Sequence, residues 1–272
     1  MKKTIKDLNL CDDFLFYHVM QKPELVIQLL EIALDLPGKI EKIEYVEREK
    51  TLRGKYDGKG VRLDVYVRTD MLTVYNIEIQ QKKRRALGKR GRQYQSTIDM
   101  DILKSGEDYD KLKPQYIIFI CTFDPFDRGF FRYRFSNRCH EDAALELGDE
   151  TMKVFLNTKG CLDNASLEMR EFLLFLENST PDEAKRAQTP FIHALSEQIE
   201  KVKADEEIGG SFMTFEQYLK DIQWEYEDKI AEMEAKYEKE KLETARKLKE
   251  QGITAKIISE ATGLDMETVE KL

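Results

Sequence analysis

The sequence predicts an α/β domain, a sheet flanked by helices, followed by an all-helical C-terminal extension. Residues 61–80 hold two short runs in which apolar and polar side chains alternate with a period of two, which is typical of paired strands. Residues 115–123, QYIIFICTF, form the most apolar run of the chain and suit a buried central strand. After Pro181 the chain becomes polar and rich in Glu and Lys, as in solvated helices.

Composition sets broad limits on the class of protein. A chain of 272 residues can form one large core, or a core with a smaller appended module. The net charge of −8, from 44 basic and 52 acidic residues, argues against a wholly basic nucleic-acid binder but is compatible with a local basic groove. The four cysteines are widely separated, as expected of reduced thiols in a cytoplasmic protein. Without a long apolar run or a signal peptide, we expect no contact with a membrane and no secretion.

The predicted elements follow one another with recognisable start and stop signals. Residues 1–35 are expected to be helical, with Asp12 or Asp13 as a cap and Pro23 opening the second helix. Asp70 and Met71 occupy the turn of the 61–80 hairpin. The other elements are a charged strand at 39–50, a helix at 82–104, strands at 115–123, 132–135 and 152–158, and a helix at 166–177.

The C-terminal third is expected to be helical throughout. Gly209–Gly210 is predicted to break the stretch up to residue 250 into two helices. Tyr226, Ile230, Met233 and Tyr237 follow a heptad-like 4-3-4 spacing, which fits a short coiled coil or a single solvated helix equally well. We divide the chain into a domain at 1–178, a charged helical extension at 179–250 and a helix-turn-helix-like tail at 251–272, which is poor in basic residues for groove readout.

Two acids stand out within the 61–80 hairpin. Asp64 lies on the more polar face of the first strand, and Glu78 on that of the second. Paired strands can bring such carboxylates to within several ångströms of each other, which suits a divalent cation. The alternative is that both are solvent-facing acids on a half-exposed sheet, since polar alternation is normal in antiparallel strands.

Several segments carry a family resemblance. In order along the chain they are DDFLFYHVM (12–20), VRLDVYV (61–67), VYNIEIQ (74–80), KRGRQYQSTIDMDIL (89–103), GEDYDKLKPQYIIFICTFDPF (106–126) and FLNTKG (155–160). This set resembles the Rpn family of recombination-promoting nucleases, also described as transposases, of the PD-(D/E)XK nuclease superfamily. The resemblance covers about the first 177 residues. It implies a restriction-endonuclease-like core, in which helices flank a mixed central sheet.

The resemblance also implies a metal site at the splayed strands. Asp64 matches the first metal-binding aspartate and Glu78 the second acidic residue, and the backbone carbonyl of Ile79 is the expected third ligand. The expected cofactor is Mg²⁺, with Mn²⁺ or Ca²⁺ as alternatives. Gln80 stands where the wider superfamily has a lysine, and glutamine is usual there in this branch. Because glutamine cannot act as a base near neutral pH, we expect it to position the attacking water, and cleavage to be slow.

Further residues complete the expected site. Asp13 matches an acidic residue of the first helix, and is otherwise a helix cap. Arg90 and Tyr94 are one helical turn apart and match the family's basic and aromatic positions. They are expected to hold phosphate, unless Arg90 pairs with a core carboxylate instead. A run of basic residues is the candidate contact to the DNA backbone, and the alternative is that it forms a plain solvated face. These residues are Lys82, Lys83, Arg84, Arg85, Lys89 and Arg92.

The function expected from these residues is that of a metal-dependent DNA endonuclease. It would hydrolyse phosphodiester bonds with low sequence specificity, in recombination, mobile elements or phage defence. A second hypothesis is a catalytically weak or inactive DNA-binding or assembly protein that acts through its C-terminal helices. A third makes the tail an inhibitory cap, or an arm that joins a homodimer.

Overall fold

The computed structural model describes residues 4–36, 40, 42–52, 61–69, 72–83, 85–162 and 165–272, without the side chains of 45–52, 61–64 and 219. The chain divides into two compact units, Met1–Gly209 and Gly210–Leu272, and each is described by itself. The boundaries predicted from composition, after residues 178 and 250, stay predictions. Within the described residues no helix combines the length and apolar content that a membrane crossing needs.

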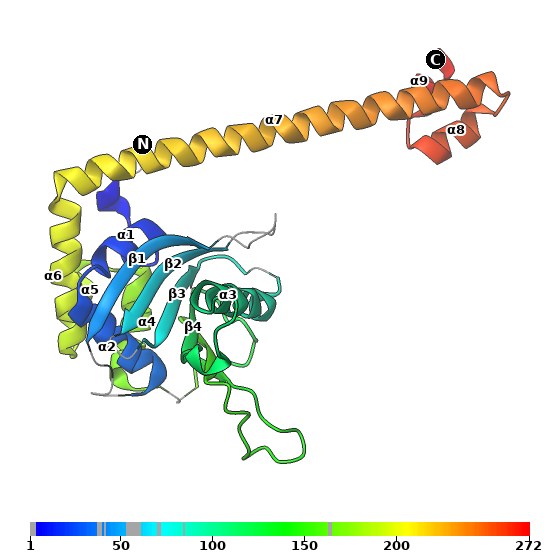
Figure 1. Cartoon of the computed structure of the whole chain (residues 1–272). Helices are drawn as coiled ribbons and strands as arrows, with labels where there is room; N and C mark the ends of the chain where they lie inside the picture. Colours follow the sequence, from blue (N-terminus) through cyan, green and yellow to red (C-terminus); the bar gives the residue numbers. More distant parts are fainter. Residues whose placement is uncertain are drawn as a thin grey trace. The chain divides into compact units, whose positions relative to one another are not determined.

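A mixed sheet forms the centre of the first unit (Figure 1). Its strands are β1 (Ile43–Leu52), β2 (Val61–Thr69), β3 (Val74–Gln80), β4 (Gln115–Cys121), β5 (Arg132–Phe135) and β6 (Thr151–Asn157). They lie in the order β1-β2-β3-β4-β6-β5. The pairs β3–β4 and β4–β6 are parallel, whereas β1–β2, β2–β3 and β5–β6 are antiparallel. This arrangement, with helices around it, is the predicted α/β fold.

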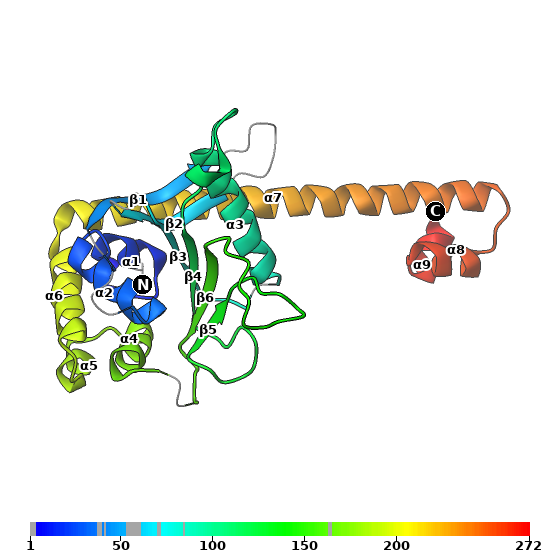
Figure 2. The ribbon, with the colours of Figure 1, turned by 60° about the horizontal axis from the view of Figure 1, so that its bottom comes forward.

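Helices cover both faces of this sheet (Figure 2). One face carries α1 (Asp13–Val19), α2 (Pro23–Leu34), α4 (Leu167–Glu177) and α6 (Pro190–Ala204), with α5 (Pro181–Arg186) beside them; the other carries α3 (Leu87–Ile102). Two short 3₁₀ helices, Ile5–Asp7 and Tyr109–Lys111, complete the unit. Because β3 and β4 are covered on both faces, nearly all their residues are buried, as the apolar run at 115–123 predicts.

The two faces of β3 carry different side chains. Val74 belongs to the cluster of buried residues that includes Tyr94 and Ile98 of α3. Side chains alternate along a strand, so Asn76 and Glu78 share this face with Val74. The face under α3 is therefore where the polar residues of the hairpin lie.

The hairpin between β2 and β3 is confirmed by its antiparallel register, in which Val67 pairs with Tyr75. The amide N of Thr69 donates to the carbonyl O of Thr73 at 3.1 Å and closes the turn. The predicted turn residues Asp70 and Met71 lie outside the described residues.

One predicted helix break is wrong. Gly209 and Gly210 both lie inside α7, which runs without interruption over Glu206–Glu250. The break falls at Asp205, whose backbone is extended (φ −77°, ψ 117°) and whose Oδ1 accepts from the amide N of Glu207 and of Ile208 at 2.9 and 3.0 Å. A carboxylate that satisfies free amides starts a helix, whereas a glycine inside one costs only about 1 kcal/mol.

The second unit ends in two short helices, α8 (Ala255–Thr262) and α9 (Met266–Lys271). Gly263 closes α8 in the left-handed conformation (φ 69°), and Asp265 caps α9 by accepting from the amide N of Thr268 at 2.8 Å. They pack on the end of α7 through a small buried cluster of Ala245, Ile258, Leu264 and Val269. The helical C-terminal extension is thus confirmed.

Candidate active site

A buried carboxylate marks the candidate site. The side chain of Glu78 lies under α3 and is only 2% exposed. Its Oε1 accepts from Nδ2 of Asn76 at 3.1 Å, and its Oε2 accepts from the hydroxyl of Tyr94 at 3.3 Å. Nη2 of Arg90 lies 3.7 Å from the same Oε2. Burial of a carboxylate is costly unless donors and a cation surround it, and here they come from β3 and α3.

Local sequence explains how these side chains converge. Asn76 and Glu78 are two residues apart on a strand, and Arg90 and Tyr94 are four apart on a helix, so each pair shares a face. Gly91 lets α3 approach the sheet, since a Cβ there would lie 3.2 Å from Cδ of Lys153. A Cβ at this position would therefore require the side chain of Lys153 to move aside.

Arg90 connects the carboxylate to the end of β3. Its Nη1 donates to Oε1 of Gln80 at 2.7 Å, and its Nη2 donates to the hydroxyl of Tyr94 at 2.5 Å. Nε2 of Gln80 in turn donates to the carbonyl O of Ile79 at 2.7 Å. Arg90 thus pairs with a core carboxylate, the arrangement that the sequence left open, yet 29% of its side chain stays exposed. A guanidinium has five N–H donors, of which these two hydrogen bonds use two.

Asp64 lies on β2, but its side chain is outside the described residues. The register next to it is clear, with Val65 paired to Ile77 and Tyr66 to Asn76. Tyr66 is buried in the same cluster as Tyr94. The predicted pairing of Asp64 with Glu78 across the two strands therefore stays a prediction.

Asp13 is the first residue of α1, and Asp12 holds the cap position before it. Oδ2 of Asp12 accepts from the amide N of Asn9 at 2.8 Å. Nε2 of Gln81 donates to the carbonyl O of Cys11 at 2.7 Å, which ties the start of α1 to the end of β3. Asp13 thus begins a helix whose start is attached to the strand that carries the candidate site.

The predicted DNA contacts lie between β3 and α3 and on α3 itself. Those that the structure describes, namely Lys82, Lys83, Arg85, Lys89 and Arg92, are all exposed. Lys83 is partly neutralised, because its Nζ pairs with Oδ2 of Asp127 at 2.8 Å. Arg84 lies outside the described residues.

Sequence reasoning missed Asn76. It is fully buried, and among the described residues its Oδ1 has no hydrogen-bond partner. Its position offered a signal, because it shares the strand face of Glu78 two residues away. An orphaned amide oxygen beside a carboxylate is the donor set that a hard cation prefers, so these residues fit a divalent metal. No group of three His, Cys, Asp or Glu side chains gathers within the described part of the chain, which does not include the side chain of Asp64.

The comparisons with known proteins agree with this geometry. A family model described as PD-(D/E)XK nuclease family transposase matches residues 11–229, which is most of the chain. No curated protein and no solved structure matches the chain. The match includes the whole sheet, α3 and every residue of the candidate site. The predicted resemblance and the PD-(D/E)XK fold are thereby confirmed, and the chain belongs to the PD-(D/E)XK nuclease family transposases.

Proposed function

We propose that this protein is a divalent-metal-dependent endonuclease that hydrolyses phosphodiester bonds of DNA with low sequence specificity. Its role would lie in recombination, mobile elements or phage defence. Family membership supports nuclease chemistry in general. The observation that carries the finer proposal is the buried carboxylate of Glu78, with Asn76, Tyr94 and Arg90 around it. A charged group kept in a core against its desolvation cost is characteristic of functional sites.

The cation would be held by three groups. If the β2–β3 register continues by one position beyond the pair Val65–Ile77, Asp64 would lie opposite Glu78, and the carbonyl O of Ile79 would follow on the strand of Glu78. These oxygens suit Mg²⁺, and also Mn²⁺ or Ca²⁺. When bound, such an ion polarises the scissile phosphate and lowers the pKa of a coordinated water. Asp13, at the start of α1, is a candidate for an outer carboxylate of the same site.

The other side chains would bind and orient the substrate. Arg90 is partly exposed and has N–H groups beyond the two that bond Gln80 and Tyr94, which it would offer to a phosphate oxygen, with the hydroxyl of Tyr94 beside it. Oε1 of Gln80 uses one lone pair on Arg90 and has a second that can accept from the attacking water. Because Gln80 brings no positive charge and cannot take the proton, slow cleavage is expected.

The basic residues around α3 would contact the DNA backbone. Lys82, Arg85, Lys89 and Arg92 are exposed, and phosphate contacts of this kind carry no base specificity. Their binding would weaken as salt rises, because each neutralised phosphate releases counterions.

Nicking of supercoiled plasmid tests the proposal. With Mg²⁺ or Mn²⁺ the wild-type protein should convert supercoiled DNA to the open-circular form, and Glu78→Gln and Asp64→Ala should not. Asp110→Asn, which removes an exposed acid remote from the site, is the matched control and should nick like the wild type. Equal nicking by wild type and both site variants would show that the activity is contamination or that the site is misassigned.

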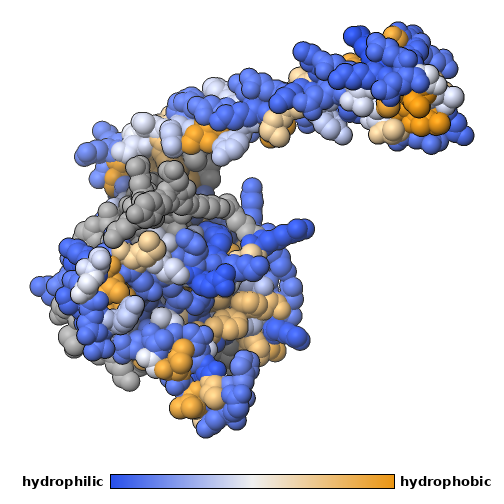
Figure 3. Space-filling model, turned by 45° about the vertical axis from the view of Figure 1, so that its right-hand side comes forward, coloured by the Kyte–Doolittle hydropathy of each residue, from blue (hydrophilic) through white to orange (hydrophobic). Residues whose placement is uncertain are grey.

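A second candidate function is DNA binding or assembly without cleavage, through the C-terminal helices. Large apolar side chains are exposed along α7 (Figure 3), with Tyr226 at 64%, Ile230 at 54% and Met233 at 70%. Exposed apolar residues at heptad-like spacing favour a partner helix, such as that of a second copy in a homodimer. Duplex binding that survives Asp64→Ala, with no cleavage under any divalent metal, would favour this candidate.

A further inference from the structure

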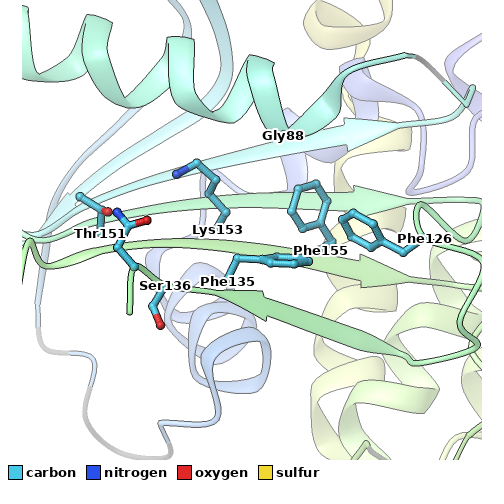
Figure 4. Close-up of a pocket in the computed structure, with 8 residues that line it drawn as sticks. Gly88, Phe126, Phe135, Ser136, Thr151, Lys153 and Phe155 are labelled. Atoms are coloured by element: carbon cyan, nitrogen blue, oxygen red, sulfur yellow. The ribbon is translucent and has the colours of Figure 1, made fainter. Parts of the chain in front are cut away.

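A pocket of about 320 Å³ lies at the β5–β6 edge of the sheet, beside the first turn of α3 (Figure 4). Its volume is at the lower end of the range for small-molecule sites, roughly 300–1,000 Å³. One end is aromatic, with Phe126, Phe135 and Phe155. The other end is polar, with Thr151 and Lys153. None of these residues belongs to the candidate active site.

The aromatic end presents exposed rings. Phe126 is 37% exposed and Phe135 is 46% exposed, whereas Phe155 beneath them is buried. The rings of Phe126 and Phe135 stand at 85° and 88° to that of Phe155, with centroids 5.0 and 5.7 Å away. Each exposed ring is thus fixed edge-on against a rigid partner. Partly exposed aromatic rings held in this way can stack against a flat group.

The polar end offers both donors and acceptors. Nζ of Lys153 donates to Oε1 of Gln95 on α3, and burial lowers the pKa of Lys153. Gln95 itself does not line the pocket, whereas Lys153, Asn137 and Thr151 do. Nδ2 of Asn137 and Oγ1 of Thr151 both donate to Oδ2 of Asp149 at 2.7 Å. A ligand with an apolar face and a polar edge matches this division of the pocket.

The pocket is joined to the candidate active site by a row of aromatic rings on the same face of the sheet. Tyr94 stacks on Phe119 at 6.1 Å, and Phe119 stacks on Phe155 at 5.1 Å. Both sites therefore lie under α3. The exposed side of that helix carries Lys89 and Arg92, which can follow a phosphate backbone.

We propose that this pocket binds one unstacked nucleobase. A base has flat apolar faces for the phenylalanine rings, and an edge of donors and acceptors for the polar end. A purely apolar ligand would make no use of Lys153, and a lone phosphate would make no use of three phenylalanines. The base would come from a single-stranded stretch of the substrate, a source that rests on the proposed nuclease function, or from a free nucleotide.

Fluorescence anisotropy in EDTA tests the pocket independently of cleavage. The probe is a labelled DNA single strand of about twelve nucleotides, compared with an abasic strand of the same length. The wild-type chain should bind the base-carrying strand about tenfold more tightly, a typical effect of one base stacked on an aromatic side chain. Phe135→Ala should lose this preference and Phe135→Tyr should keep it. Phe130→Ala, similarly exposed at 40% but outside the pocket, is the matched control and should behave like the wild type.

Particular outcomes would overturn the proposal. Equal binding of both strands by the wild type, or an unchanged preference in Phe135→Ala, would show that no base enters the pocket. Full preference in Phe135→Leu would show that apolar bulk suffices and that no ring stacks. If millimolar thymidine monophosphate competes with the strand, a free nucleotide is a source of the base. If it does not compete, while the wild type still prefers the base-carrying strand, the base comes from a strand. The binding assay contains EDTA and therefore does not depend on cleavage. Loss of plasmid nicking alone would count against the proposed nuclease and not against this pocket.

Discussion

Arg90 is the residue whose replacement should most directly test the structure of the candidate site. Arg90→Met removes the guanidinium but keeps an unbranched side chain that can pack on the ring of Tyr94, where the Arg90 Cζ now lies 5.5 Å from the ring centroid. The variant removes the ion pair that Arg90 makes with Glu78, only 2% exposed, and removes the donor that Arg90 gives to Oε1 of Gln80. We expect a marked loss of stability.

The magnitude follows from the partners. Breaking a fully buried ion pair costs about 3–5 kcal/mol, because the remaining charge stays buried. Here the cost lies at or below the lower end of that range, since the closest N–O distance of the pair is 3.7 Å and 29% of the Arg90 side chain is exposed, so that water can enter. Asn76 and Tyr94 also keep their hydrogen bonds to the carboxylate. We therefore expect a fall of about 2–3 kcal/mol in the free energy of unfolding.

Urea titration followed by near-ultraviolet circular dichroism measures this fall. The signal reports packed aromatic rings, of which stacked pairs such as Tyr75–Tyr116 lie in the first unit. With a slope of about 2 kcal/mol per molar urea, the midpoint should drop by about 1–1.5 M. Arg92→Met, on the exposed side of the same helix, should stay within about 0.5 kcal/mol of the wild type. A midpoint for Arg90→Met equal to that of the control would refute the coupling between Arg90 and the buried carboxylate.

Four other predictions follow. Asn76→Ala should lower stability by about 1–2 kcal/mol and slow plasmid nicking, because the buried carboxylate loses a donor. Burial raises the pKa of Tyr75 to about 12. The unfolded phenol ionises from about pH 10, so the wild type should lose stability as the pH rises from about 10 to 12. Tyr75→Phe should reduce this loss of stability in urea titrations. Burial raises the pKa of the Cys121 thiol to about 12, so iodoacetamide at pH 8 should label exposed Cys161 and spare Cys121 in peptide mass spectra. Met233→Glu should convert any dimer to monomer in sedimentation velocity.

Each of these has a result that would contradict it. Normal nicking by Asn76→Ala would remove the amide from the site. A Tyr75→Phe curve parallel to the wild type above pH 10 would mean that this phenol does not titrate with unfolding. Early labelling of Cys121 would show that β4 opens to solvent. A wild-type chain that sediments as a monomer at high concentration would exclude the dimer outright.

Local patterns predicted much of the fold. The run at 115–123 identified β4, since so apolar and short a segment has to be a covered strand. Gly263 marks the end of α8 through a left-handed conformation that few other residues adopt, and Asp265 marks the start of α9 through its side-chain cap. The break predicted at Gly209–Gly210 was wrong because a glycine pair permits a helix break but does not impose one. The residue that sets the break is Asp205, whose side chain caps the start of α7.

The candidate site was less accessible to sequence reasoning. Alternation along β3 identified Glu78. The same alternation predicts that Asn76 is an ordinary exposed polar residue, although it is buried. Periodicity alone does not show which face of a strand a helix such as α3 covers. The aromatic pocket left no local pattern, since Phe126, Phe135 and Phe155 come from separate segments that only the β5–β6 pairing and the preceding loop bring together. Such sites arise from tertiary structure, and no short stretch of sequence contains them.

The position of Arg90 has a consequence for how activity can be controlled. In the wider superfamily the cation at this point belongs to a lysine on the strand, and it stays in register with the acids whatever the neighbouring helices do. Here the strand offers Gln80, and the positive charge reaches it from α3. The charge is therefore beside Gln80 only while α3 is docked, so under the proposed nuclease function a shift of this helix would remove the charge from the site.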